Sequence, residues 1–234
     1  MSHDNPLPER LNQVGVFFLL LVSADTAFVI VHLVHEFSPF LSNSFYSLET
    51  DRGYSEIFQY VKIYWIVILL AALWRLRREG VYVAWMLLYA YLLCDDAFQI
   101  HERGGGAIAR HWGYENALGL RARDFGELTV AGALGLAFLV LIGIMYLRSA
   151  CDARNASKDL TLLFSVIVFF GVIIDMLHIV AGDGYGNVVF GVIEDGGEMF
   201  ATSAVCWYVL NLLERRGKAP TPLWRLTKKA VTQR

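Results

Sequence analysis

The chain has 234 residues, of which 56% are hydrophobic and only 18% are charged, with a formal net charge of −2. A soluble domain carries about 25% charged residues, and the mean hydropathy here is +0.46, so the composition excludes an ordinary soluble domain. The three cysteines lie far apart and form no CxxC pair, which excludes a disulfide framework and a thiolate metal site.

Long apolar runs separated by short charged stretches predict an all-α fold, a polytopic membrane helix bundle. A bilayer core needs about 20 apolar residues per helix, and six segments qualify as transmembrane helices: 13–36, 57–75, 80–101, 126–147, 159–180 and 189–213. We therefore expect a single six-helix transmembrane domain over 1–213. Residues 214–234 form a basic tail with seven Lys or Arg and one acid, and no nucleic-acid-binding signal accompanies it.

Basic residues set the expected orientation, because short loops rich in Lys and Arg stay in the cytoplasm. Such residues follow the second span, follow the fourth span and fill the tail, at Arg75, Arg77, Arg78, Arg148, Arg154, Lys158 and beyond residue 214. Both termini are then cytoplasmic, and the first, third and fifth spans end outside. The expected location is a bacterial inner membrane, with the ends of these spans facing outward.

Histidines and acids gather at the expected outer ends of the spans. In chain order they are His32, His35 and Glu36, then Asp95, Asp96, His101 and Glu102, then Glu127, Asp175 and His178, and last Glu194, Asp195 and Glu198, whereas Asp25 lies deeper, near the middle of the first span. Residues three, four or seven apart share one helix face, so each span can aim several of these groups inward. Carboxylates at one level repel one another unless a cation or a shared proton intervenes.

A divalent metal, zinc or iron and possibly two ions, relieves this repulsion, since both ions bind imidazole and carboxylate together. The predicted metal ligands are His32, Asp95, His101, Asp175, His178 and Glu198. Glu102 and Glu194 are the predicted catalytic bases, and further ligands come from Asp25, His35, Glu36, Asp96, Glu127 and Asp195. Arg121 and Arg123 are predicted to hold a headgroup phosphate.

Three classes of function fit this pattern. The favoured one is a metal-dependent membrane enzyme, a hydrolase or a di-iron oxidoreductase, that acts on a lipid or another amphiphilic substrate. The second is a proton or metal-cation transporter, in which Asp25 continues the acidic column inward and requires a charged or proton-sharing partner. The third is a non-catalytic assembly subunit, and a purely structural polar network is the plain alternative.

Lys62 is placed at the edge of the second span rather than within the membrane, and Arg103-Gly-Gly-Gly is interpreted as a helix stop with a flexible exit.

The segment FYSLETDRGYSEIFQY together with CDDAFQIHE resembles a loose group of uncharacterised bacterial membrane proteins. In that group the third span ends in acidic residues that are followed, after a short gap, by His-Glu, and the resemblance covers about residues 45–103. A weaker similarity is to the ceramidase-like and adiponectin-receptor-like membrane hydrolases, which implies zinc held by histidines near one membrane face and action on lipid amides. This chain has six expected spans and no histidine pair in the last one.

Overall fold

The computed structural model describes residues 13–181 and 187–218, and these residues form a bundle of long helices. The helices are α1 (Gln13–Phe37), α2 (Tyr54–Arg77), α3 (Gly80–Phe98), α4 (Ile100–Trp112), α5 (Ala122–Arg148), α6 (Cys151–Val168), α7 (Asp175–Ala181), α8 (Asn187–Gly191) and α9 (Gly197–Glu214). A short 3-10 turn, Ser44–Tyr46, lies between α1 and α2. The expected all-α bundle is confirmed.

Two π-helical turns interrupt the last two long helices. Phe169–Ile174 joins α6 to α7, and Val192–Gly196 joins α8 to α9. The two turns pack on each other, with the ring of Phe170 against Gly197, where a Cβ atom would clash. Single π turns within α-helices occur frequently at functional sites. The first turn is followed directly by Asp175 of α7, and the second contains Glu194 and Asp195 and precedes Glu198 of α9.

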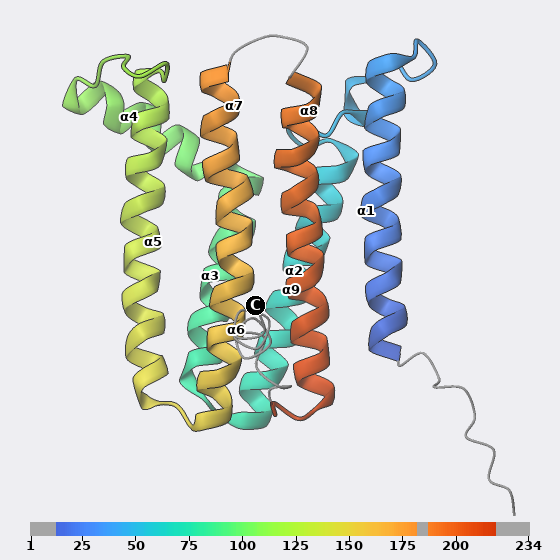
Figure 1. The fold of residues 1–234 in the computed structure, drawn as a ribbon. Helices are drawn as coiled ribbons and strands as arrows, with labels where there is room; N and C mark the ends of the chain where they lie inside the picture. The colour runs from blue at the N-terminus through green and yellow to red at the C-terminus, as the bar shows by residue number, and fades with distance from the viewer. Residues whose placement is uncertain (1–12, 182–186, 219–234) are drawn as a thin grey trace, which may run out of the picture.

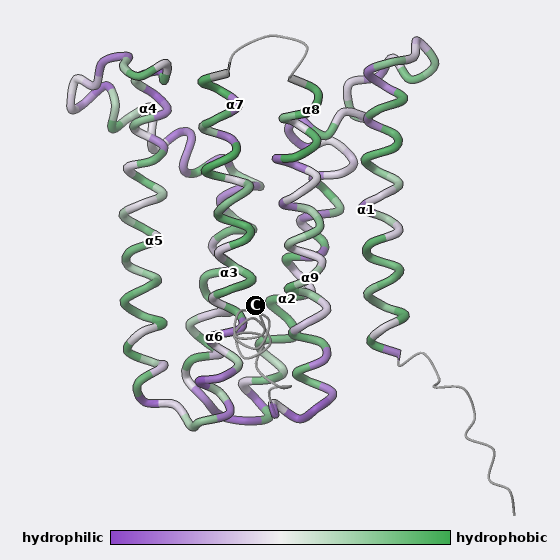
Figure 2. Tube along the Cα trace, viewed as in Figure 1, coloured by the Kyte–Doolittle hydropathy of each residue, from purple (hydrophilic) through white to green (hydrophobic). Residues whose placement is uncertain are grey.

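Five of the helices are long and apolar enough to cross a membrane: Gln13–Phe37, Tyr54–Arg77, Gly80–Phe98, Ala122–Arg148 and Cys151–Val180. The chain is therefore an integral membrane protein. Residues 187–214 run continuously alongside α6 and α7 (Figure 1), but they do not belong to this set of five. Polar residues concentrate at the two ends of the bundle, with an apolar middle between them (Figure 2).

The buried core is built by α2, α3, α6 and α9, whose inward side chains include Leu70, Trp85, Leu160 and Val209. In contrast, α1 and α5 lie on opposite sides of the bundle (Figure 1) and expose large apolar side chains, among them Leu20 and Leu136. Unpaired apolar faces of this size are stable in contact with lipid. The described ends of the chain, Gln13 and the residues after Glu214, lie at the same end of the bundle, which we call the lower end (Figure 1).

The structure corrects the third expected span. Helix α3 ends at Phe98 because Gln99 adopts a left-handed conformation with φ +53°, and α4 then starts in a new direction across the upper end (Figure 1). His101 and Glu102 therefore belong to α4 and not to the span. The Gly-rich stretch after Arg103 is helical rather than a stop. The greater part of the predicted tail, residues 219–234, lies outside the described residues.

Candidate functional site at the upper end of the bundle

Asp95 and His101 form a close pair across the break between α3 and α4. The Asp95 carboxylate accepts the His101 backbone N–H at 2.8 Å and the ring Nδ1–H at 2.9 Å. The first contact satisfies a backbone donor in the first turn of α4, and the second fixes the imidazole. Their separation of six residues would not place these groups on one face of a continuous helix, so the pairing depends on the turn at Gln99.

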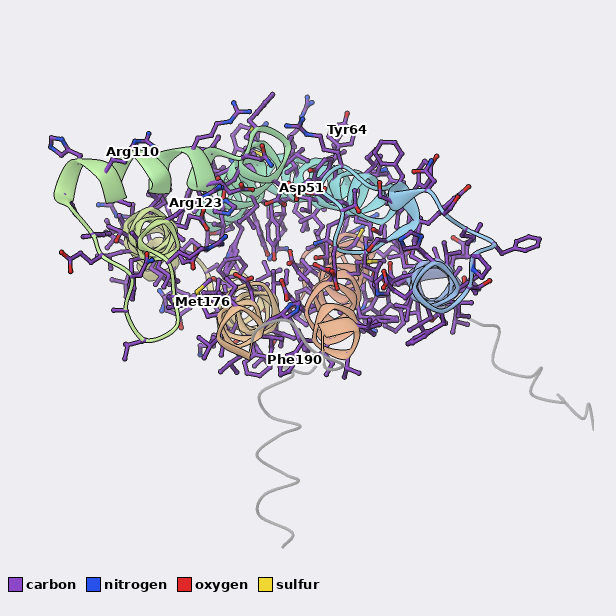
Figure 3. The ribbon with its side chains drawn as sticks, turned by 90° about the horizontal axis from the view of Figure 1, so that it is seen from above. Asp51, Tyr64, Arg110, Arg123, Met176 and Phe190 are labelled. Atoms are coloured by element: carbon purple, nitrogen blue, oxygen red, sulfur yellow. The ribbon has the colours of Figure 1, made fainter. Side chains whose placement is uncertain are left out.

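A second group ties α4 to α5. Arg123 donates to Glu102 at 2.5 Å and to Glu127 at 2.6 Å, and it lies where the two helices meet, as seen from above (Figure 3). Arg121 donates several hydrogen bonds to the Asp124 carboxylate, the shortest from its guanidinium being 2.8 Å between Nη2 and Oδ1. Both predicted headgroup arginines are thus already paired with carboxylates, and the predicted base Glu102 is paired with Arg123.

The helices on the opposite side of the bundle supply a second histidine–carboxylate pair. His178 Nδ1–H donates to Glu194 Oε2 at 2.7 Å, and the ring stacks on Phe190 with a centroid separation of 5.7 Å. Asp175, one turn earlier, interacts electrostatically with both members of the pair. Glu194, predicted as a base, is placed to orient His178.

The histidines of α1 have other partners. His32 is fully buried, and its Nδ1 accepts the backbone N–H of Leu48 at 3.2 Å, with the Ser47 hydroxyl at 3.3 Å. The Nδ1 of His35 lies 2.6 Å from the Leu41 carbonyl oxygen, and its Nε2 lies 3.8 Å from Glu36. These contacts anchor the segment that connects α1 to α2.

A buried ion pair lies below the upper end, within the bundle. Lys62 Nζ donates to Asp25 Oδ1 at 2.8 Å, to the Met199 carbonyl at 2.8 Å and to Ser203 Oγ at 3.1 Å. Both charged side chains have 0% exposure. The expectation that Asp25 needs a partner is confirmed, whereas the placement of Lys62 at a span's edge was wrong.

An acidic cavity of about 150 Å³ lies between residues 48–51, α2, α3 and the start of α9. Three predicted residues, Asp96, Asp195 and Glu198, line it together with acids that the sequence analysis had not selected: Glu49, Asp51 and Glu56. Gln59 also lines it and donates to Glu198 Oε1 at 2.8 Å. Glu49 and Gln59 were missed because nothing in the local sequence marks a loop acid or a span glutamine as facing a cavity.

The predicted residues thus gather at one end but divide into pairs and one cavity. Within residues 13–181 and 187–218, no three His, Cys, Asp or Glu side chains stand close enough to hold a metal ion. The expected shared ion among His32, Asp95, His101, Asp175, His178 and Glu198 stays a prediction. Any ion here would need bridging water or a movement of side chains.

Among the described residues outside the membrane-spanning helices, three groups have displaced pKa values. The hydrogen bond to Asp95 raises the pKa of His101 above its usual value, against the opposing effect of burial. Partial desolvation raises the pKa of Glu49, and the nearby His178 opposes this shift. The bond to Asp124 raises the pKa of Arg121. The contact with Asp95 therefore favours the protonated form of His101.

A family model, described as a domain of unknown function (DUF8692), matches residues 14–212, and the chain belongs to this family. The match includes every helix from α1 to α9 and agrees with the resemblance to an uncharacterised group. It brings no link to the ceramidase-like hydrolases. No curated protein and no solved structure matches the chain.

Proposed function

We propose that this chain is a metal-dependent membrane enzyme that acts on a lipid or another amphiphile at the outer face of a bacterial inner membrane. In this proposal residues 187–214 form a sixth crossing and both termini are cytoplasmic. One observation carries it: two imidazoles at the same end, His101 and His178, are each held by a carboxylate at Nδ1. Carboxylate contacts of this kind fix the tautomer and orientation of histidines that bind metals or move protons.

The chemistry follows from these contacts. Because Asp95 and Glu194 hold the Nδ1 atoms, the ligand or base role falls to Nε2 of each ring. A bound zinc ion would supply an activated water for hydrolysis, whereas a pair of iron ions would supply oxidation. Asp175, beside His178, adds a carboxylate in reach of the same region.

The substrate class rests on a second hollow. A cavity of about 410 Å³ opens between residues 114–117 and the first turns of α5, lined by Tyr114, Ala117, Phe125 and Leu128 among others. Its lining is largely apolar, and part of it comes from α5, the helix that also carries Arg123 and Glu127. An acyl chain in this hollow would bring the polar part of an amphiphile toward the upper end.

The test is metal content of the full-length protein purified in detergent. The expected result is zinc or iron in a fixed ratio to protein, with loss in His178→Ala and in His101→Ala. His111→Ala is the matched control, because His111 lies in the exposed last turn of α4. Equal metal content in wild type and both histidine variants would contradict the proposal.

A second candidate function, transport of protons or cations, is favoured by the Lys62–Asp25 pair. Ionisable groups inside a membrane are costly and mark ion or proton pathways. A further buried pair, Tyr208 hydroxyl to Asp159 at 3.0 Å, lies nearer the lower end. The expected result for transport is a flux into liposomes that disappears in folded Asp25→Asn and persists in Asp152→Asn, a carboxylate outside the core. Equal flux through Asp25→Asn would exclude this candidate.

A further inference from the structure

The acidic cavity carries an unbalanced set of charges. Six carboxylates line it, and among the residues that the structure describes no basic side chain does. The six are Glu49, Asp51, Glu56, Asp96, Asp195 and Glu198. Lys62, a buried cation that interacts with Glu198, already donates to Asp25, Ser203 and the Met199 carbonyl. Carboxylates this crowded repel one another unless a positive species is shared among them.

Two further oxygens in the wall are without partners. Gln59 Oε1 and Ser55 Oγ are buried and form no hydrogen bond within the described part of the chain. The two residues are 8% and 4% exposed, and both line the cavity. The Gln59 amide is oriented by its Nε2, which donates to Glu198, so its oxygen is left as an acceptor without a donor.

Such atoms are costly in a folded protein. A buried polar group without a partner costs about 1–3 kcal/mol, and each case calls for an explanation such as a bound water or ion. A fixed amide oxygen, a hydroxyl and carboxylates together make a set that consists entirely of oxygen. Oxygen sets select hard cations, whereas imidazole and thiolate favour zinc, copper or iron.

We propose that this cavity binds one hydrated, hard divalent cation, Mg²⁺ or Mn²⁺. Its volume of about 150 Å³ is well above the roughly 10–15 Å³ that one water needs, which leaves room for an ion that keeps part of its water shell. Magnesium keeps several waters and uses only one or two carboxylates directly. This accords with the spacing of the acids, since no three of the described ones can bind a bare ion.

The site goes beyond the proposed enzyme function, because no imidazole lines the cavity. Its walls come from the segment before α2, from α2, from α3 and from the π-helical turn before α9, through Glu49, Gln59, Asp96 and Asp195. A cation here neutralises acids on all four and holds the segment before α2 against the π-helical turn that precedes α9. It would perform this role in an enzyme or in a transporter.

The experiment is a Mn²⁺ titration of full-length protein in detergent, followed by the loss of the free Mn²⁺ signal in electron paramagnetic resonance. The expected result is one saturable site from which Mg²⁺ displaces Mn²⁺. Asp195→Asn and Gln59→Leu should each weaken Mn²⁺ binding about tenfold or more, the usual effect of removing a metal's supporting groups. Asp152→Asn, which removes a carboxylate paired with Arg77 outside the cavity, is the matched control.

Two outcomes overturn the proposal. One is the absence of saturable Mn²⁺ binding, in which case the acids share protons instead; the other is equal Mn²⁺ affinity in wild type and Asp195→Asn. Ser55→Ala, a small change in the same wall, replaces Gln59→Leu if that variant does not fold. Zinc and iron content is measured in the same samples to separate this site from the proposed enzyme site. His101→Ala should lose zinc or iron but leave Mn²⁺ binding unchanged.

Discussion

The histidines of the upper end carry their protons on different ring nitrogens. In His32, Nδ1 accepts the Leu48 N–H, so a neutral ring carries its proton on Nε2. In His101 and His178 a carboxylate faces Nδ1, which places the proton there. A metal at Nε2 of His32 would require a ring without any proton, so His32 serves the connection after α1, and the ligand role fits the other two.

The first prediction concerns the pH response of His101. Since Asp95 raises the pKa of His101, the protonated pair stabilises the fold fully below the unfolded value of about 6.5, and this stabilisation is lost as pH rises through the folded pKa. Asp95→Asn should lower the pKa of His101 and remove this pH dependence of stability. Histidine-selective NMR titration measures the pKa directly, and an unchanged midpoint in Asp95→Asn would refute the pairing.

At the scale of elements, the contact between α4 and α5 is set by two glycines. A Cβ at Gly126 would overlap the Gly105 carbonyl, and a Cβ at Gly105 would overlap the backbone of Glu127. The two backbones approach too closely for any side chain, and Arg123 then bridges Glu102 and Glu127 over the same contact. The glycine run that resembles a helix stop is therefore a packing surface.

The second prediction follows from this contact. Gly105→Ala should destabilise the protein by about 1–3 kcal/mol, the usual cost of overpacking, because the added Cβ would force the backbones of α4 and α5 apart. Gly132→Ala, in the partner helix α5, is the control, since a Cβ there meets nothing within 4 Å, and the exchange should stabilise the helix by up to about 1 kcal/mol. Unfolding in mixed micelles compares the two, and equal stability would contradict the close contact.

At the scale of the whole molecule, the long segments alternate in direction between the lower and upper ends (Figure 1). Seen from above, Asp51 lies on the side of α2, and Met176 and Phe190 lie across the bundle from it (Figure 3). Cys151 begins α6 at the lower end and is exposed. The two ends of the bundle should therefore face opposite sides of the membrane.

The third prediction tests this arrangement with an impermeant maleimide on intact bacterial cells. In a background with Cys94 and Cys206 replaced, Phe40→Cys, in the exposed segment before α2, should react from outside. Cys151 should react only after the membrane is opened. The reverse pattern would place the upper end in the cytoplasm, and reaction of both from outside would contradict the crossings.

The sequence predicted the helices of the bundle well, because apolar runs of membrane length have few alternative structures. It did not predict the break at Gln99, since a single left-handed residue leaves no mark in hydropathy. The gathering of acids at one end was predicted from their positions along the helices. Their division into pairs depends on helix rotation and on loop contacts such as Leu48 with His32, which sequence spacing does not contain.

The buried Lys62–Asp25 contact has a consequence for how the chain is made. Asp25 emerges from the ribosome 37 residues before Lys62, and a lone charge in the middle of a membrane helix costs about 2.5–3.5 kcal/mol during insertion. Insertion of α1 into the lipid is thus unfavourable until Lys62 of α2 is present to pair with Asp25. Biosynthesis favours entry of α1 and α2 together as a hairpin, with the last helix closing over the pair only at the end of translation.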